Sequence, residues 1–274
     1  FLRGEKLKGS FALVRSTDPK NWFLIKHRDA FASEREVTEQ LRSVVSGLTV
    51  EELKRLPAPP PLPAGRLVPG GRSEAMPARL APMLAEIGET PFVHPDWLFE
   101  PKLDGYRALA FVRNGEVKLR SRRGLDLTPA FPQIVAELAG QGADLILDGE
   151  ILALDAAGRP SFNALQNRAL LKTPREIALA EREAPAIFCC FDLLHFAGLD
   201  LRTSPYSDRR RYLAQCLLPT PHVQLVHADA DGIALNEAAL AKGFEGVMAK
   251  RRDSRYEVVR RSSACLKIKH THSA

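Results

Sequence analysis

Lys102-Leu103-Asp104-Gly105-Tyr106-Arg107 carries the most information about this 274-residue sequence. A chance match to Lys-x-Asp-Gly-x-Arg is expected in roughly two chains per thousand of this length. A neutral lysine amine can attack phosphorus and form a covalent phosphoramidate. In an extended segment Lys102 and Asp104 lie on one face, so the carboxylate is expected to orient the amine. Gly105 is expected to admit a nucleotide closely, and Arg107 to hydrogen-bond to its sugar or phosphates.

Strand-like runs surround this motif. Residues 107–112 and 116–120 flank the dipeptide Asn114-Gly115, which is typical of a two-residue hairpin turn. Apolar runs at 145–154 and 187–194 predict two more strands. Helices are predicted to begin where capping residues precede helical sequence, at Thr128-Pro129, Ser161 and Ser207. Hairpins mixed with helices predict an α+β domain of antiparallel sheets flanked by helices.

The N-terminal part is separated from this region by a proline-rich segment. Residues 57–70 read PAPPPLPAGRLVPG, which predicts a semi-rigid linker. Before it, the apolar runs 11–14 and 22–25 predict a hairpin, and two strands alone are only marginally stable in water. The expected organisation is a hairpin-containing segment at 1–45, a linker at 46–78 and the main domain at 79–274.

Composition is ordinary for a globular protein that acts in a reducing compartment. No run approaches the roughly 20 apolar residues of a membrane helix, and the first ten residues lack the apolar core of a secretory signal. A cytoplasmic location without membrane contact is therefore expected. The chain opens on Phe1, which suits a piece of a longer polypeptide. The four cysteines show no metal-binding spacing, and the net charge of +6 is only weak support for a phosphate-rich partner.

Five further segments contain residues suited to binding a nucleotide or a metal ion. They follow the Lys102 motif along about 170 residues. They are Ser121-Arg122-Arg123-Gly124, Asp148-Gly149-Glu150, Phe188-Cys189-Cys190-Phe191-Asp192-Leu193-Leu194, Glu245-Gly246-Val247-Met248-Ala249-Lys250 and Leu266-Lys267-Ile268-Lys269.

Each segment also has a purely structural explanation. The Lys102 motif fits a charged turn with Gly105 in the left-handed region, and Glu150 fits a turn cap. Phe191 fits a strand packed in the core, and the lysines of the last segment alternate with apolar residues as in any half-exposed strand. Arg122 and its neighbour fit a solvated pair. The occurrence of all six segments, one after another along a single chain, favours the functional interpretation.

Together the six segments resemble the motifs of the nucleotidyl-transferase superfamily, which contains ATP-dependent DNA ligases, RNA ligases and mRNA-capping enzymes. The resemblance implies an α+β, ATP-grasp-like adenylation domain in which Lys102 becomes bonded to AMP. It implies that Phe191 stacks on the purine and that Glu150 and Glu245 hold Mg²⁺ or Mn²⁺. The side chain of Glu100 is expected to matter little, because the family contacts adenine through the backbone there. The other nucleotide-binding residues implied are Arg107, Arg122, Glu150, Glu245, Arg261, Lys267 and Lys269.

Within the superfamily, the sequence is most similar to the multi-domain bacterial ligases of non-homologous end joining. Residues 4–9, 11–15, 22–26 and 29–30 resemble the end of their 3′-phosphoesterase domain, which precedes a proline-rich linker and the ligase. No histidine cluster is found in residues 1–56, so no phosphatase or nuclease activity is expected. Cys265 stands where that family usually has tryptophan.

The resemblance also implies partners and a limit. DNA with nicked or broken ends is the expected substrate, with an end-binding repair protein and a polymerase domain as further partners. The OB-fold domain of DNA ligases is absent from these residues, so efficient sealing is not expected from them alone.

Three other functions remain in competition. A GTP-dependent capping enzyme or an RNA ligase would use the same lysine, and the phosphoesterase-like N-terminal part argues against capping. A truncated, non-catalytic DNA-binding remnant would keep the fold without turnover. A basic RNA-binding domain would leave the ordered lysine motifs unexplained.

Overall fold

The computed structural model describes residues 2–3, 6–15, 21–33, 40–42, 49, 51, 68, 70–155, 160–169, 171 and 173–269. Contacts divide the chain into two compact units, Phe1–Pro60 and Pro61–Ala274, which are described separately. Most of the predicted proline-rich segment lies outside the described residues.

The first unit contains short antiparallel strands. β1 (Leu2–Arg3) pairs with β2 (Lys8–Gly9), and β3 (Phe11–Arg15) pairs with β4 (Trp22–Lys26). The predicted hairpin is therefore confirmed, although residues 16–20, which join its strands, lie outside the described part. Asp29 accepts a hydrogen bond from the backbone of Ser10 and pairs with Lys26, whose contact holds the pKa of Asp29 down at about 2.

The second unit is built on a seven-stranded sheet in the order β5-β12-β11-β10-β8-β9, with β13 added beside β11. Every pairing is antiparallel except the parallel one between β11 and β13. The predicted strands are confirmed, with ends displaced by at most two residues. The strands are β5 (Arg72–Ser73), β8 (Tyr106–Arg113), β9 (Glu116–Ser121), β10 (Leu145–Ala153), β11 (Ala186–Phe196), β12 (Leu199–Asp200) and β13 (Val223–Leu225).

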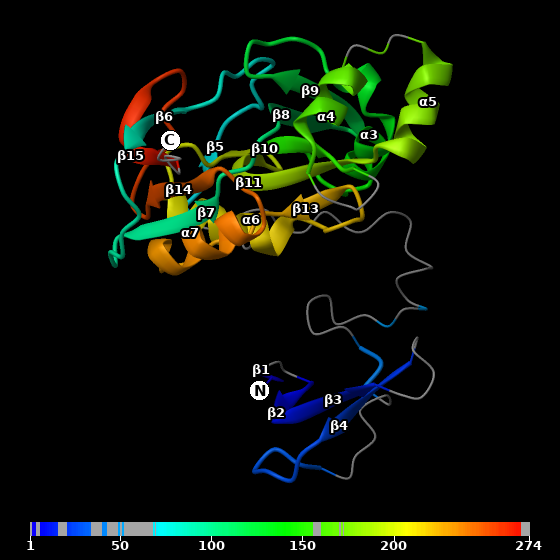
Figure 1. Ribbon diagram of the computed structural model, residues 1–274, viewed down its shortest axis with the longest axis vertical. Coiled ribbons are helices and arrows are strands. Elements are labelled where there is room, and N and C mark those ends of the chain that lie inside the picture. The colour runs from blue at the N-terminus through cyan, green and yellow to red at the C-terminus, as the bar shows by residue number, and fades with distance from the viewer. Residues whose placement is uncertain are drawn as a thin grey trace. The chain divides into compact units, whose positions relative to one another are not determined.

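A four-stranded sheet joins segments that are far apart in the sequence (Figure 1). Its order is β6 (Leu84–Gly88), β15 (Arg261–Lys269), β14 (Gly246–Arg251) and β7 (Trp97–Pro101). β6 pairs with β15 in parallel and the other pairs are antiparallel, so the prediction of antiparallel sheets holds with two parallel exceptions.

Helices cover these sheets, and their starts correct part of the prediction. Ser161 precedes α4 and accepts a bond from the Ala164 backbone, as expected. Thr128 begins a short 3₁₀ turn rather than a helix, and Ser207 lies inside α6 because that helix begins one residue earlier, after Pro205. The helices are η2 (Thr128–Ala130), α3 (Pro132–Ala139), α4 (Phe162–Ala169), α5 (Pro174–Glu183), α6 (Tyr206–Cys216) and α7 (Gly232–Ala241).

The seven-stranded sheet is buried on both faces. Alternate residues of β8 separate accordingly: Ala108, Ala110 and Val112 pack with α3 and the largest core cluster, whereas Leu109 and Phe111 point to the opposite face. That second face also buries Met83 and Tyr256, which come from outside the sheet. The turn at Asn114-Gly115 has both residues in the left-handed region, as a two-residue hairpin requires.

Candidate active site

Lys102 lies where the two sheets of the second unit meet. It directly follows β7 of the four-stranded sheet, and β8 of the seven-stranded sheet begins four residues later. Its backbone N–H donates to the carbonyl of Gly246 at 2.8 Å. Of the predicted segment from Lys102 to Arg107, only Tyr106 and Arg107 belong to a strand, and residues 102–105 lie between β7 and β8.

The amine of Lys102 is held by Glu245, the residue just before β14. Lys102 Nζ donates to Glu245 Oε2, and Lys269 Nζ lies 3.1 Å from the same oxygen. The hydrogen bond from Lys102 holds the pKa of Glu245 below its usual range, with Lys269 adding to the effect. Asp104 is exposed and makes none of these contacts, so the expectation that it orients the amine is wrong. Glu245 has that position.

Two glycines allow the close backbone approach that builds this junction. A Cβ on Gly105 would lie 2.2 Å from the carbonyl oxygen of Ile151 in β10, so this glycine permits the close approach of the neighbouring strand. Gly246 has a φ of 140°, and a Cβ there would lie 2.1 Å from the Ile268 carbonyl oxygen. Both positions exclude larger residues.

Glu150 is half-buried on β10, directly across from Arg107. Burial raises the pKa of its carboxyl to about 8, although the charges of Arg107 and Lys102 act in the opposite direction. Burial therefore favours the protonated form of this carboxyl near neutral pH. This carboxyl is suited to binding a positive charge, which would favour its ionised form.

The raised pKa predicts a pH-dependent stability. Because the folded-state pKa of about 8 exceeds the ordinary value of 4.5, the folded protein binds a proton that the unfolded chain has lost. This contribution is complete below about pH 4.5 and is lost as the pH rises through 8. Urea unfolding between pH 6.5 and 9, without divalent cations, should show that the free energy of unfolding of the wild type declines as the pH rises. The free energy of unfolding of Glu150→Gln should decline less steeply. If it falls with pH in parallel with that of the wild type, the raised pKa does not belong to Glu150.

A β-bulge directs two consecutive side chains of β11 to the same face. Asp192 pairs with Asp148 and Cys190 pairs with Gly149, so Phe191 has no partner on β10. Such an extra residue reverses the alternation of side chains along the strand. Phe191 and Asp192 both line one cavity, together with Arg107 and Lys250.

The aromatic ring of Phe191 lies beside two cationic side chains. The Lys250 amine lies 4.3 Å from the ring centroid and the Arg107 guanidinium carbon 5.5 Å. The side chain is half-buried and is not a member of the apolar core clusters. These contacts favour the stacking role over the alternative of simple core packing.

Phe191→Ala should weaken ATP binding by about 1–3 kcal/mol, the scale of aromatic–base stacking. A core role predicts instead a loss of about 3–5 kcal/mol in the free energy of unfolding. Nucleotide titration and urea denaturation of the same preparation separate the two effects. An unchanged ATP affinity with a large loss of stability would exclude stacking.

The side chain of Glu100 does more than the sequence comparison implied. It is 1% exposed, and its carboxylate accepts from the Tyr206 hydroxyl and the Lys250 amine, both at 2.5 Å. Arg210 lies 3.8 Å away. The expectation that this side chain matters little is therefore wrong: it anchors Lys250 above the Phe191 ring.

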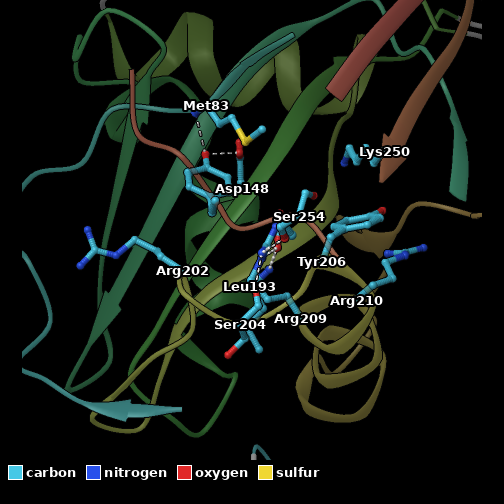
Figure 2. A network of polar contacts seen from close by, with 12 residues as sticks. Met83, Asp148, Leu193, Arg202, Ser204, Tyr206, Arg209, Arg210, Lys250 and Ser254 are labelled. Atoms are coloured by element: carbon cyan, nitrogen blue, oxygen red, sulfur yellow. Dashed lines mark hydrogen bonds and ion pairs between the residues drawn. The ribbon is translucent and has the colours of Figure 1, made fainter. Parts of the chain in front are cut away.

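Arg107 is oriented by Asp148 through two parallel hydrogen bonds, Nε to Oδ1 at 3.0 Å and Nη2 to Oδ2 at 2.7 Å. Burial disfavours its charge, but Asp148 outweighs this and raises the pKa of Arg107, which stays charged. A second such pair, Arg209 with Asp192, lies beside the cavity. Figure 2 shows Arg209 next to Ser204 and Ser254, whose carbonyls accept from it. Sequence inspection missed Arg209, since an arginine within a helix gives no sign of burial.

The remaining predicted residues are less closely tied to Lys102. Arg122 is exposed, and its backbone N–H donates to the Arg107 carbonyl at 3.1 Å. Lys267 is half-buried on β15, opposite Met248 of β14. Arg261 is exposed at the start of β15 and donates to the Ala85 carbonyl, and no contact within the described residues joins it to the Lys102 cluster.

The structure also shows which side chains are available to bind a metal ion and in what state the cysteines are. The described residues contain no cluster of three or more His, Cys, Asp or Glu side chains arranged for a metal ion. Glu150 and Glu245 nevertheless fit a divalent ion shared with phosphates, since Mg²⁺ in such sites takes only one or two carboxylates. All four cysteines are free thiols. Across the described residues no helix is long and apolar enough to span a membrane.

Comparison with known proteins identifies the class. Residues 82–269 match the family model of the ATP dependent DNA ligase domain. This chain belongs to the family of ATP-dependent DNA ligases, in its adenylation domain, and the predicted nucleotidyl-transferase fold is confirmed. The alternatives of a capping enzyme and of a non-catalytic remnant are not favoured.

The most informative relatives are multifunctional end-joining proteins. The chain is 40% identical over 194 residues to the multifunctional non-homologous end joining protein LigD of Mycobacterium bovis, covering 70% of this chain and 24% of that protein. It is 34% identical over 280 residues to the corresponding protein of Pseudomonas aeruginosa, covering 98% of this chain and 32% of the relative. The chain thus spans about a quarter to a third of the relatives' length.

A solved structure gives the same assignment. The ligase domain of LigD from M. tuberculosis superimposes with a TM-score of 0.59 at 38% identity, over 70% of this chain and 60% of that one. A mycobacterial DNA ligase D complexed with ATP matches with a TM-score of 0.58, also at 38% identity over 70% of this chain and 60% of that one. The resemblance to end-joining ligases of the LigD type is therefore confirmed.

Proposed function

We propose that this chain forms lysyl-AMP from ATP, with Lys102 as the nucleophile, and passes the AMP to a DNA 5′-phosphate. The observation that carries the proposal is the contact between Lys102 Nζ and Glu245 Oε2 at the junction of the two sheets. This contact fixes an amine beside a carboxylate and a second lysine, Lys269, an arrangement suited to attack on the α-phosphorus of a nucleoside triphosphate.

The residues then have separate tasks. Lys102 Nζ bonds to the α-phosphorus, the bond to the leaving pyrophosphate breaks, and the amine proton leaves toward Glu245 or solvent. Lys267 and Lys269 offset negative charge on the phosphate oxygens. Phe191 stacks on the purine, Glu100 lies beside its edge with Lys250, and Arg107 and Arg122 hydrogen-bond to the sugar. Arg261 is the outermost phosphate contact.

A divalent cation, Mg²⁺ or Mn²⁺, belongs to this proposal. Glu150 and Glu245 would hold it, and it would supply charge neutralisation for the triphosphate. The half-buried carboxyl of Glu150, whose pKa is raised to about 8 by burial, is the feature that supports its position. A bound cation would favour the ionised form of this group.

The wider biology is inferred from the relatives. We propose that the chain acts in double-strand break repair in the cytoplasm, on nicked or broken DNA, with an end-binding protein and a polymerase as partners. Residues 1–45 are proposed to be the end of a phosphoesterase domain, followed by a linker at 46–78 and the adenylation domain at 79–274. The alignment of 98% of this chain to the P. aeruginosa protein supports this organisation.

The test is incubation with α-labelled ATP and Mg²⁺, followed by denaturing electrophoresis. The expected result is a label that remains on the protein in heat and base but is lost in acid, as a phosphoramidate should be. Labelled GTP is the comparison, and stronger labelling by GTP would overturn the ATP assignment.

A further inference from the structure

Tyr256 connects a loop outside the sheets to the arginine that faces the nucleotide site. It lies between β14 and β15, is 6% exposed, and packs with Met83, Leu109 and Phe111 on the second face of the seven-stranded sheet. Its hydroxyl reaches Asp148 Oδ2 at 2.5 Å, and Asp148 is the carboxylate that holds Arg107.

The direction of these hydrogen bonds is fixed by the partners. The backbone N–H of Met83 donates to the Tyr256 oxygen at 3.1 Å, so the one hydroxyl proton must go to Asp148. Burial raises the pKa of Tyr256 well above its ordinary value, with the Asp148 charge adding to the effect, so the hydroxyl keeps this proton. Figure 2 shows Met83 and Asp148 side by side at this point.

Asp148 therefore depends on Tyr256 for its orientation. Its side chain is fully buried, and a buried carboxylate is stable only when its oxygens have hydrogen-bond partners. Among the residues that the structure describes, Oδ1 accepts from Arg107 Nε alone, whereas Oδ2 accepts from both Arg107 and Tyr256. The hydrogen bond from Tyr256 fixes the carboxylate, which could otherwise rotate together with the Arg107 guanidinium.

Arg107 in turn has one end available for a ligand. Its Nε and Nη2 are taken by Asp148, its side chain is 24% exposed, and its guanidinium faces the Phe191 ring. Among the described residues Nη1 has no hydrogen-bond partner. The direction of Nη1 is set by the plane of the guanidinium, and Asp148 sets that plane.

We propose that Tyr256 is a positioning residue for lysyl-AMP formation, acting through Asp148 to aim Arg107 at the nucleotide. The inference rests on the proposed function. It assigns to the β14–β15 loop a direct part in the adenylation step, although no residue of that loop needs to touch ATP.

Tyr256→Phe keeps the ring and removes only the hydroxyl. A hydrogen bond to a charged group is worth enough that lysyl-AMP formation at low ATP should slow about tenfold. Tyr212→Phe is the matched control, because Tyr212 is similarly buried, lies on α6, and has a hydroxyl that accepts a hydrogen bond from Arg211. This control should form lysyl-AMP at the wild-type rate.

A double-mutant cycle separates positioning from a general loss of structure. In an Arg107→Lys background the charge remains but the planar two-bond contact is gone. The effect of Tyr256→Phe should then fall from about tenfold to less than about twofold, since the residue acts through the guanidinium. An equal effect in both backgrounds would overturn the proposal, as would a wild-type rate for Tyr256→Phe alone.

The four proteins of the cycle, which are the wild type, Tyr256→Phe, Arg107→Lys and the double variant, are also titrated with ATP. Their affinities for ATP complete the cycle where labelling is too slow to follow. Additive effects on affinity would then count against the proposal. Failure of the proposed function is distinguishable, because in that case the wild type itself acquires no label. Normal labelling of both wild type and Tyr256→Phe would overturn only the role of Tyr256.

Discussion

Lys102→Ala should acquire no covalent label from α-labelled ATP, at any concentration of nucleotide or Mg²⁺. The loss should be complete rather than partial, because only the amine at this position can form the bond to phosphorus. The side chain is 15% exposed at the junction of the sheets, and Glu245 keeps Lys269 as a partner once Lys102 is removed. The urea midpoint should therefore change little, and ATP should still bind.

Lys118→Ala is the matched control for this experiment. Lys118 is exposed on β9, and its removal should leave labelling at the wild-type level. Gel analysis of the three proteins in parallel is the measurement. Equal labelling of wild type and Lys102→Ala would refute the assignment of the nucleophile.

Arg209→Met should lower the free energy of unfolding by about 3–5 kcal/mol, the usual consequence of leaving one buried charge without its partner. Arg209 is 1% exposed, and its Nε and Nη2 lie 2.8 and 2.9 Å from the two oxygens of Asp192. Burial disfavours its charge, yet Asp192 outweighs this and raises the pKa of Arg209. Methionine keeps much of the length but leaves Asp192 as an uncompensated buried carboxylate.

Arg211→Met on the same helix provides the comparison. Arg211 pairs with Asp208 at 2.9 Å, but its side chain is 56% exposed, and such pairs contribute about 1 kcal/mol or less. Urea unfolding of both variants should therefore give clearly different midpoints. Similar losses for Arg209→Met and Arg211→Met would mean that the buried pair contributes no more than a surface pair.

The candidate residues of the site could be named from the sequence because they lie in short, ordered segments. Lys102, Glu150, Phe191 and Glu245 were each named from short motifs, the last three through resemblance to the family. The structure places Glu245 in contact with Lys102 and leaves Glu150 close enough for the charge of Lys102 to act on it. The hydrogen-bond partner of the lysine was not predictable, since it depends on a contact between residues 143 positions apart. Asp104 was chosen because it is near in sequence, whereas the chain leaves the strand there and turns Asp104 outward.

Other differences have local causes that sequence patterns do not reveal. The bulge at Phe191 arises from the register of β11 against β10, and an apolar run of strand residues shows no mark of it. The importance of the Glu100 side chain depends on Lys250 and Tyr206, which belong to two other elements. Ser207 resembles a cap, but the helix begins at Tyr206.

The pairing of β6 and β7 with β14 and β15 has a consequence for synthesis of the protein. At about 5–20 residues per second, a ribosome needs about 7–30 s to extend the chain from Lys102 to Glu245. During that interval the strands that precede Lys102 have their hydrogen-bonding edges open, because their partners in the four-stranded sheet have not yet been made. Such edges invite pairing with other chains. The junction around Lys102 is therefore among the last features to form, and newly made chains should be most vulnerable to aggregation just before translation reaches the final strand.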